Sequence, residues 1–195
     1  MKKLLNNFKP FLFSITFLVL GGSTLSGQLN IQAGLNGSSI RIETDGFSVE
    51  TDSKPGFHIG AMYRTRISNS FFFTSGAQFS QKGASFAGIF DFTLNYIDIP
   101  ILFVYQKDPE RGFFADFGLY AAALISADSE GEDIKDGFKS ADFGLMLGAG
   151  YDFGKIMVGI RGGIGFPNIT ADDGTGATGD KAVISNGQLY VAFKI

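Results

Sequence analysis

Charged residues within alternating apolar stretches are the first candidates for chemistry. Arg64, Asp98, Asp116 and Arg161 each lie where hydrophobic residues occupy every second position, and each falls at an intervening position. Alternate side chains of a strand point to opposite faces, so these charges are expected on one enclosed face. The same positions hold Arg66, Lys82, Asp142, Asp152 and Lys194. Because an unpaired buried charge costs several kcal/mol, we expect a structural charge network with Asp98 paired to Arg64 or Arg161. The alternative is that these inward charges form a gate or a path for protons.

His58 is the only histidine, and it falls on the same face as these charges. Catalysis by histidine requires a nucleophile beside it, for which Ser80, Ser126 and Asp142 are the candidates. One histidine and no cysteine exclude a multi-His metal site, a thiolate site and a cysteine nucleophile. We therefore predict no catalytic, cofactor-binding or metal-ligating residue. A lipid-modifying enzyme that uses His58 is kept as an alternative.

The segment from Asp128 to Ser140 carries five acids and two lysines. Divalent cations prefer carboxylate oxygens and would link such a segment to lipopolysaccharide phosphates. The ligand order does not fit an EF-hand, because Lys139 stands at the twelfth position. Neither a phosphate-binding glycine motif nor a basic patch for nucleic acid is present, so no nucleic-acid partner is predicted.

The first residues have the pattern of an export signal. Lys2 and Lys3 precede the apolar run FLFSITFLVL at Phe11–Leu20, and small residues follow it. The run is too short to span a bilayer as a helix, so residues 1–27 are predicted to be a cleaved secretory signal peptide. Removing it takes away three lysines and no acid, which lowers the net charge from −3 to −6.

From Gln28 onward the period is two, which is typical of strands. We count eight strands, joined alternately by short and long connections. The short connections are 68–70, 106–112 and 154–155, and the long ones are 40–55, 83–91, 128–140 and 167–183. An even number of strands with turns of alternating length is typical of outer-membrane barrels, which place the long loops outside. Gln28 and Ile195 would then face the periplasm.

The two faces of these strands differ in polarity, and the polar face is the one expected inside the barrel. A soluble protein has the opposite arrangement. One face is rich in Phe, Ile, Leu and Val, while the other carries charges and many of the 27 glycines. Inward glycines would leave space for Tyr96, Tyr120, Arg64 and Arg161 in a narrow lumen. Phenylalanines and tyrosines near both strand ends suit interfacial girdles. The prediction is an all-β, eight-stranded antiparallel up-and-down transmembrane β-barrel over residues 28–195.

Several segments resemble the PorT-like outer membrane protein beta-barrel domain family of Gram-negative bacteria. They are Gly34-Leu35-Asn36, GFHIGAMY at Gly56–Tyr63, FFFTSGAQFSQKGA at Phe71–Ala84, LNYIDIPILFVY at Leu94–Tyr105, and GIRGGIGFPNIT with the closing strand. The resemblance implies an outer-membrane barrel, often without an assigned activity. One namesake member serves a protein-secretion system.

We therefore expect an outer-membrane protein with a structural or interaction role and a filled, non-conducting lumen. The expected partners are outer-membrane lipids, lipopolysaccharide, the barrel assembly machinery during insertion, and an unidentified membrane or secretion-system protein. The last residues, Gly187 to Ile195, resemble an assembly signal, although Ile195 replaces the usual terminal aromatic residue. A secreted lipocalin-like ligand-binding barrel is the other alternative, and it would need an apolar lumen.

Overall fold

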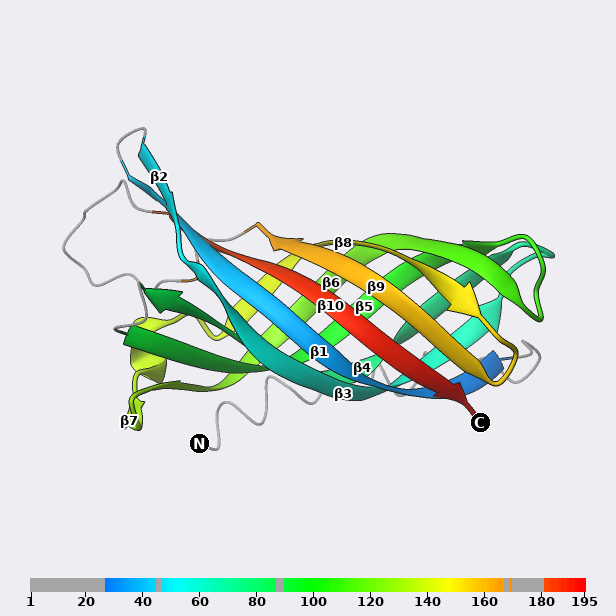
Figure 1. Cartoon of the computed structure of the whole chain (residues 1–195), viewed down its shortest axis with the longest axis horizontal. Helices are drawn as coiled ribbons and strands as arrows, with labels where there is room; N and C mark the ends of the chain where they lie inside the picture. Colours follow the sequence, from blue (N-terminus) through cyan, green and yellow to red (C-terminus); the bar gives the residue numbers. More distant parts are fainter. Residues whose placement is uncertain (1–26, 45–46, 87–89, 167–168, 170–180) are drawn as a thin grey trace, which may run out of the picture.

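The chain forms a closed antiparallel barrel, seen in a computed structural model that describes residues 27–44, 47–86, 90–166, 169 and 181–195 (Figure 1). Eight strands make the wall: β1 (Gly27–Thr44), β3 (Asp52–Arg66), β4 (Phe71–Phe86), β5 (Phe90–Gln106), β6 (Gly112–Ser129), β8 (Ala141–Asp152), β9 (Ile156–Gly165) and β10 (Lys181–Lys194). Two short strands, β2 (Phe47–Glu50) and β7 (Glu132–Asp133), and a 3₁₀ turn, η1 (Lys135–Gly137), extend from it. The predicted eight-stranded up-and-down barrel is confirmed.

Closure comes from the first and last wall strands. β1 pairs with β10 from Asn30↔Lys194 to Glu43↔Lys181, and every other wall strand pairs with its neighbour in the chain. A closed sheet leaves no unpaired edge, so the backbone amides and carbonyls of the wall hydrogen-bond to one another. Within the described residues, no helix is long and apolar enough to cross a membrane. The predicted signal peptide lies outside the described residues, except for Gly27, and stays a prediction.

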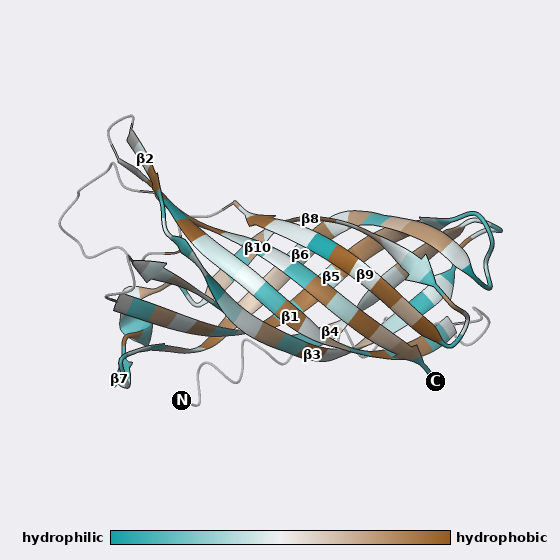
Figure 2. Ribbon diagram, in the orientation of Figure 1, coloured by the Kyte–Doolittle hydropathy of each residue, from teal (hydrophilic) through white to brown (hydrophobic). Residues whose placement is uncertain are grey.

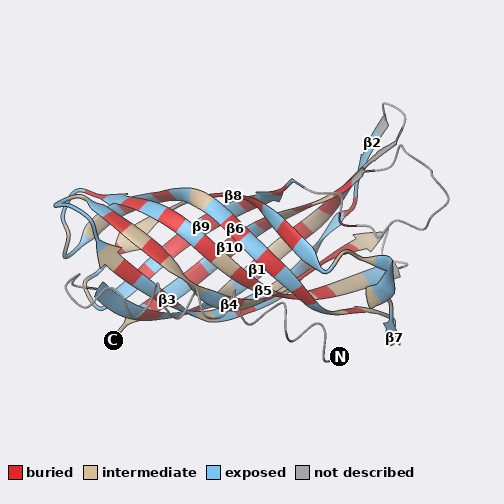
Figure 3. Cartoon of the chain, turned by 180° about the vertical axis from the view of Figure 1, so that it is seen from behind, coloured by how far each residue is buried: buried red, intermediate tan, exposed pale blue. Residues whose placement is uncertain are grey.

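Burial alternates along most of each wall strand, with the charged side chains of the wall mainly inside and most of the exposed positions apolar. In β9, Ile160 is 62% exposed whereas Arg161 is 6% exposed. The same checkerboard of buried and exposed positions covers the barrel in Figure 3. Brown apolar bands alternate with pale or teal ones along the strands in Figure 2. This distribution is inside-out for a soluble protein, and it confirms the faces predicted from the period of two.

The short connections lie where they are predicted, except that Gln106 and Gly112 belong to strands, and the long connections are shorter than expected. β3 ends at Arg66 and β4 begins at Phe71, and the turns after β5 and β8 are similarly tight. At the opposite end, β1 pairs with β2 over positions that were predicted to be loop, and β6 continues to Ser129 to pair with β7. These extensions are rich in polar residues and were not predicted as strands. Strands that continue beyond the apolar band are not in contact with lipid, so they do not need an apolar face. Most of the predicted 167–183 loop lies outside the described residues.

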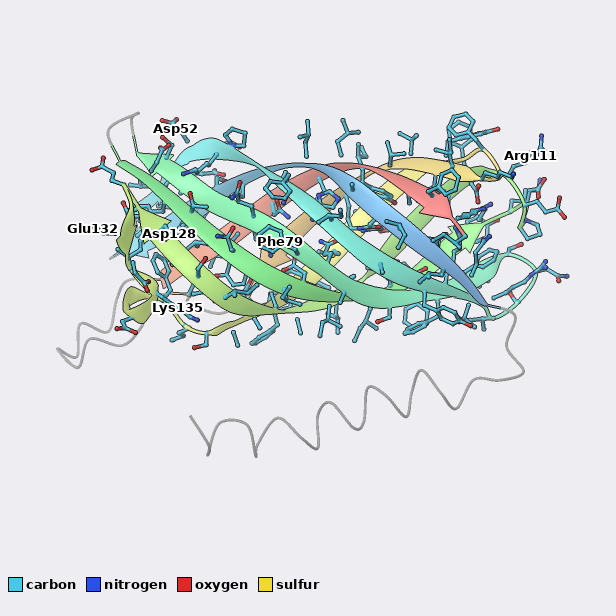
Figure 4. The ribbon with its side chains drawn as sticks, turned by 90° about the horizontal axis from the view of Figure 1, so that it is seen from below. Asp52, Phe79, Arg111, Asp128, Glu132 and Lys135 are labelled. Carbon is cyan, nitrogen blue, oxygen red and sulfur yellow. The ribbon has the colours of Figure 1, made fainter. Side chains whose placement is uncertain are left out.

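Exposed aromatic rings form a belt near the short turns. Phe71 packs on Tyr105, Phe103 packs on Phe117, and Tyr151 packs on both Phe113 and Phe153, with ring centroids 4.6–5.9 Å apart. Near the other end, Phe57 pairs with Phe79 at 5.5 Å and Phe143 with Phe166 at 6.1 Å. Figure 4 shows Phe79 on the outside of the wall. Two aromatic levels that flank an apolar band are the expected pattern for a barrel in a bilayer.

Candidate functional site

The lumen of the barrel holds the candidate site, because the buried charges of the described residues gather there. We distinguish four levels by their residues. The turn-end layer is Arg64, Gln106, Asp152 and Lys194; the middle layer is Asp116, Arg161 and Tyr190; the loop-half layer is Gln78, Lys82, Asp98, Tyr96, Tyr120 and Asp142; and the apolar plug is Ile40, Leu94, Leu124, Ile169 and Ile184. These levels succeed one another from the short turns to the opposite end of the barrel.

The turn-end layer crosses the lumen through Gln106. Arg64 Nη2 donates to Gln106 Oε1 at 2.8 Å, and Gln106 Nε2 donates to Asp152 Oδ2 at 3.2 Å. Asp152 also accepts a short hydrogen bond from Lys194 Nζ, and it lies 4.0 Å from Arg64 Nη1. The Arg64 guanidinium stacks over the Phe72 ring at 4.0 Å. Residues from β3, β5, β8 and β10 are thereby tied together beside the short turns.

The middle layer is a bidentate ion pair across β8. Arg161 Nε and Nη2 donate to the two carboxylate oxygens of Asp116 at 3.1 and 3.0 Å, and Nη2 also reaches the Tyr190 hydroxyl at 3.3 Å. Asp116 lies on β6 and Arg161 on β9, and Gly148 of β8 is the register partner of both. Because Gly148 has no side chain, the carboxylate and the guanidinium meet over its backbone.

Gly148→Ala is expected to destabilise the barrel by roughly 1–3 kcal/mol, because its Cβ would lie 2.6 Å from Asp116 Oδ1. Gly162→Ala is the matched control, since its Cβ points outward and meets nothing closer than the Leu147 carbonyl oxygen at 3.9 Å. Urea unfolding of the two variants in detergent, followed by the unheated gel band, measures the difference. Equal stability of both variants would contradict the close approach across β8.

The loop-half layer corrects the expected partner of Asp98. Asp98 accepts hydrogen bonds from Lys82 Nζ at 2.9 Å and from Gln78 Nε2 at 3.3 Å, so neither Arg64 nor Arg161 is its partner. Lys82 also lies 4.9 Å from the centres of the Tyr96 and Tyr120 rings. The reason is local, because Lys82 and Gln78 belong to β4, the strand that pairs with β5. Lys82 on the neighbouring strand therefore neutralises the charge of Asp98, and neither arginine is needed for that.

Asp142 completes this layer and is held by a tyrosine. Tyr120 Oη donates to Asp142 Oδ2 at 2.8 Å, while Oδ1 has no hydrogen-bond partner among the described residues. A Cβ at Gly144 would lie 2.7 Å from the Tyr120 ring. The inward glycine thus leaves the space for Tyr120 that was expected from the sequence.

His58 is buried beside Asn36, and within the described residues its ring makes no hydrogen bond to a serine, although Ser80 is its register partner on β4. Its Nδ1 lies 2.6 Å from Asn36 Oδ1, and Asn36 Nδ2 donates to Ser80 Oγ at 3.0 Å. His58 is 1% exposed and Ser80 is fully buried, and both face the lumen. The candidate base and the candidate nucleophile are therefore linked through hydrogen bonds to Asn36 and not to each other, and the wall separates both from the outer surface.

An apolar plug fills the lumen at the end opposite the short turns. Its five residues pack with Ala84, Ala127 and Ala182, while Ile134 and Phe138 around η1 cover them. The backbone N–H of Lys139 donates to the Ile169 carbonyl at 2.7 Å, and Ile169 N–H donates to Ala182 at 3.0 Å. The expected polar interior is thus wrong at this level. The sequence pattern places Ile40 in a loop, whereas it lies on β1 and is buried in the plug.

Two further residues differ from the sequence prediction at the turn end. Arg66 is exposed instead of inward, and its Nε donates to the Ser68 carbonyl at 3.2 Å. Gln106 was assigned to a connection, but it is fully buried and joins Arg64 to Asp152. Its position continues the alternation of Leu102 and Val104 and was the available signal.

The outer surface at the plug end carries exposed ion pairs and acidic groups. Lys54 Nζ lies 3.6 Å from Asp91, and Arg41 lies 3.6 Å from Glu50. A hydrogen bond with Ser85 and the charge of Lys54 hold the pKa of Asp91 below its usual value. Across the described ranges, no three His, Asp or Glu side chains are placed to hold a metal ion.

Comparison with known proteins identifies the family and the fold. The family described as outer membrane protein beta-barrel domain matches residues 25–171. The solved Neisserial surface protein A is 15% identical, with a TM-score of 0.52, over 86% of this chain and 97% of that one. Ail of Yersinia pestis, solved alone, is 14% identical with a TM-score of 0.47, over 87% of this chain and 99% of that one. The outer membrane enzyme PagL is 16% identical with a TM-score of 0.47, over 82% and 99%.

No curated protein matches the sequence significantly. The family match covers well over half of the 195 residues, and the closed eight-stranded barrel agrees with it. The chain belongs to the outer membrane protein beta-barrel domain family, which places it in the outer membrane.

Proposed function

We propose that this protein is a non-conducting barrel with a structural or interaction role at the outer membrane. The observation that carries the proposal is the obstruction of the lumen by four successive levels. Arg64–Gln106–Asp152, Arg161–Asp116 and Lys82–Asp98 each bridge side chains from different strands. The apolar plug then covers the end opposite the short turns. An interior that side chains fill in this way leaves no continuous aqueous path.

In this proposal Arg64, Asp98, Asp116 and Arg161 are structural. Arg64 belongs to the turn-end layer, Asp98 to the loop-half layer, and Asp116 and Arg161 form the bidentate pair. All four residues are at most 6% exposed. Buried charges that are paired and hydrogen-bonded fix the mutual positions of the strands that carry them. The partner surface is then the exterior and the extended outer end, where β2 and β7 project beyond the wall (Figure 1).

We further propose that outer-membrane lipids and lipopolysaccharide are partners of that end. Glu132 and Asp133 of β7 and Asp136 of η1 are exposed there. Carboxylates of this kind bind divalent cations, which would link them to lipopolysaccharide phosphates. An unidentified membrane or secretion-system protein, and the assembly machinery during insertion, are the other partners we propose. Export through a cleaved signal peptide at residues 1–27 belongs to the same proposal.

Purified protein inserted into a planar bilayer is expected to give no stepwise ion conductance, since the loop-half layer and the apolar plug close the lumen. Insertion is verified on the same sample by protease protection, and a porin prepared in the same detergent serves as the positive control. Reproducible channel openings by the wild-type protein would contradict the closed-lumen proposal.

The enzymatic alternative depends on His58, and the contacts of His58 support it less well. A histidine base must reach its nucleophile directly or through one water molecule. Here His58 Nδ1 and Ser80 Oγ each hydrogen-bond to Asn36, and the described residues show no hydrogen bond between His58 and Ser80. The lipocalin-like alternative is likewise disfavoured, because charged layers cross the middle of the lumen.

A further inference from the structure

Two cavities in the turn-end half of the lumen share Arg64 in their linings. The outer one, here called the vestibule, has a volume of about 140 Å³ and is lined by Gln28, Arg64, Arg66, Phe72, Pro109, Glu110 and Lys194. The inner one has a volume of about 20 Å³ and lies between Arg64 and Arg161, with Asn30, Thr74, Asp116 and Tyr190 in its lining. We propose that the inner cavity binds a small inorganic anion of halide size, which enters through the vestibule.

Unpartnered polar atoms surround the inner cavity. Arg64 Nε, Arg161 Nη1 and Thr74 Oγ1 are buried donors without a hydrogen-bond partner in the described part of the chain. Each of these residues is at least nine-tenths buried. Asn30 Oδ1 is a fourth unpartnered atom, and an amide group presents either its oxygen or its nitrogen. Buried donors left without a partner are costly, so donors that share one cavity indicate a missing acceptor.

The charge balance of this half of the lumen favours an anion over a neutral acceptor. Arg64, Arg161 and Lys194 bring three positive charges, and Asp116 and Asp152 bring two negative ones. Both oxygens of Asp116 already accept from Arg161, and Asp152 Oδ2 accepts from Lys194 and Gln106. The vestibule lining adds one further positive charge, Arg66, and one negative charge, Glu110, which cancel in the sum. The buried groups of this half of the lumen therefore carry a net charge of one positive. A buried net charge is costly because it has lost its hydration, and a bound anion would compensate it.

The size of the inner cavity selects the kind of anion. About 20 Å³ is enough for a single water-sized species, whereas a phosphate or sulfate ion is too large. Guanidinium N–H groups are strong donors to anions, and two arginines converge here. A bound chloride is compatible with a non-conducting lumen, because the loop-half layer and the apolar plug lie beyond it.

Crystals of the detergent-folded protein grown in sodium bromide test the site directly. The expected result is an anomalous bromide peak in the inner cavity, within hydrogen-bonding distance of Arg64 Nε and Arg161 Nη1. A water molecule with no anomalous signal at that position would overturn the proposal. A bromide confined to the vestibule, beside Arg66 and Lys194, would also overturn it.

A solution experiment uses thermal unfolding at constant ionic strength, with sodium chloride compared with sodium gluconate. Chloride is expected to raise the unfolding temperature of the wild type with saturation. Arg64→Gln and the nearly isosteric Thr74→Val should weaken the apparent chloride affinity, the former about tenfold or more. Lys82→Gln is the control, because Lys82 is a lumen cation of the loop-half layer and should leave the chloride-dependent shift unchanged.

The unheated gel band shows whether each variant is folded before it is compared. If Arg64→Gln does not fold, Thr74→Val and the wild-type bromide experiment still decide the question. An identical unfolding temperature of the wild type in chloride and gluconate would overturn the proposal, and so would a full chloride shift in folded Arg64→Gln.

Discussion

Replacing Asp116 with leucine is expected to lower the free energy of unfolding by about 3–5 kcal/mol. The change removes both acceptors of the bidentate pair and leaves the Arg161 guanidinium, which is 6% exposed, without its carboxylate. A buried charge that loses its partner keeps its desolvation cost but not its compensation. Urea-induced unfolding and refolding of the purified barrel in lipid vesicles measures the change, with the heat-modifiable gel shift as the readout.

The double variant Asp116→Leu/Arg161→Met provides the internal control. Removing both charges and keeping apolar volume is expected to restore much of the lost stability, because no uncompensated charge then remains. Glu50→Gln is a matched surface control, since its carboxylate pairs with Arg41 at 3.6 Å while half exposed, and it should change stability by less than about 1 kcal/mol. A double variant as unstable as the single one would mean that the ion pair itself, and not the unpaired charge, sets the cost.

The period of two predicts the face of most charged residues in the wall, with Arg66 as an exception, but it does not predict their partners. Arg64, Asp98, Asp116 and Arg161 all lie inside, because a single strand fixes the face of each side chain. Pairing depends on the tilt and register of neighbouring strands, which the alternation does not contain. Asp116 and Arg161 meet only because Gly148 stands between them on β8.

The ends of the barrel were harder to predict than its wall. Most exposed positions of the wall are apolar, as lipid requires, but the converse expectation of a polar interior fails in part. Met62, Leu102 and Met146 are buried along the wall, and Phe72, Phe114 and Met157 form a buried cluster near the short turns. Ile40, Leu94 and Ile184 are likewise inside at the plug end. The role of Gln106 was not predicted for a related reason. A polar residue beside a turn is typical of a loop, although here the alternation of the strand continues to Gln106.

The second large expected effect concerns the orientation of the barrel in the membrane. The sequence has no cysteine, so a single introduced cysteine can be labelled without background from other thiols. A cysteine introduced at Glu132 is the only thiol in its variant, and we expect an impermeant maleimide to label it on intact cells. A cysteine at Arg111 should remain unlabelled. Glu132 and Arg111 lie at opposite ends of the barrel, as Figure 4 shows, and both are exposed. Outer-membrane barrels place their short turns in the periplasm and their longer connections outside.

Arg111 is a better position than Asp108 in the same turn, because the Asp108 carboxylate accepts a hydrogen bond from the Glu110 backbone N–H at 2.9 Å and its loss would disturb the turn. Permeabilised cells should label both variants equally, which controls for thiol reactivity. Labelling of Arg111→Cys but not Glu132→Cys on intact cells would invert the topology. The acidic residues of β7 and η1 would then face the periplasm, away from lipopolysaccharide, and the vestibule beside Arg64 would open to the cell exterior.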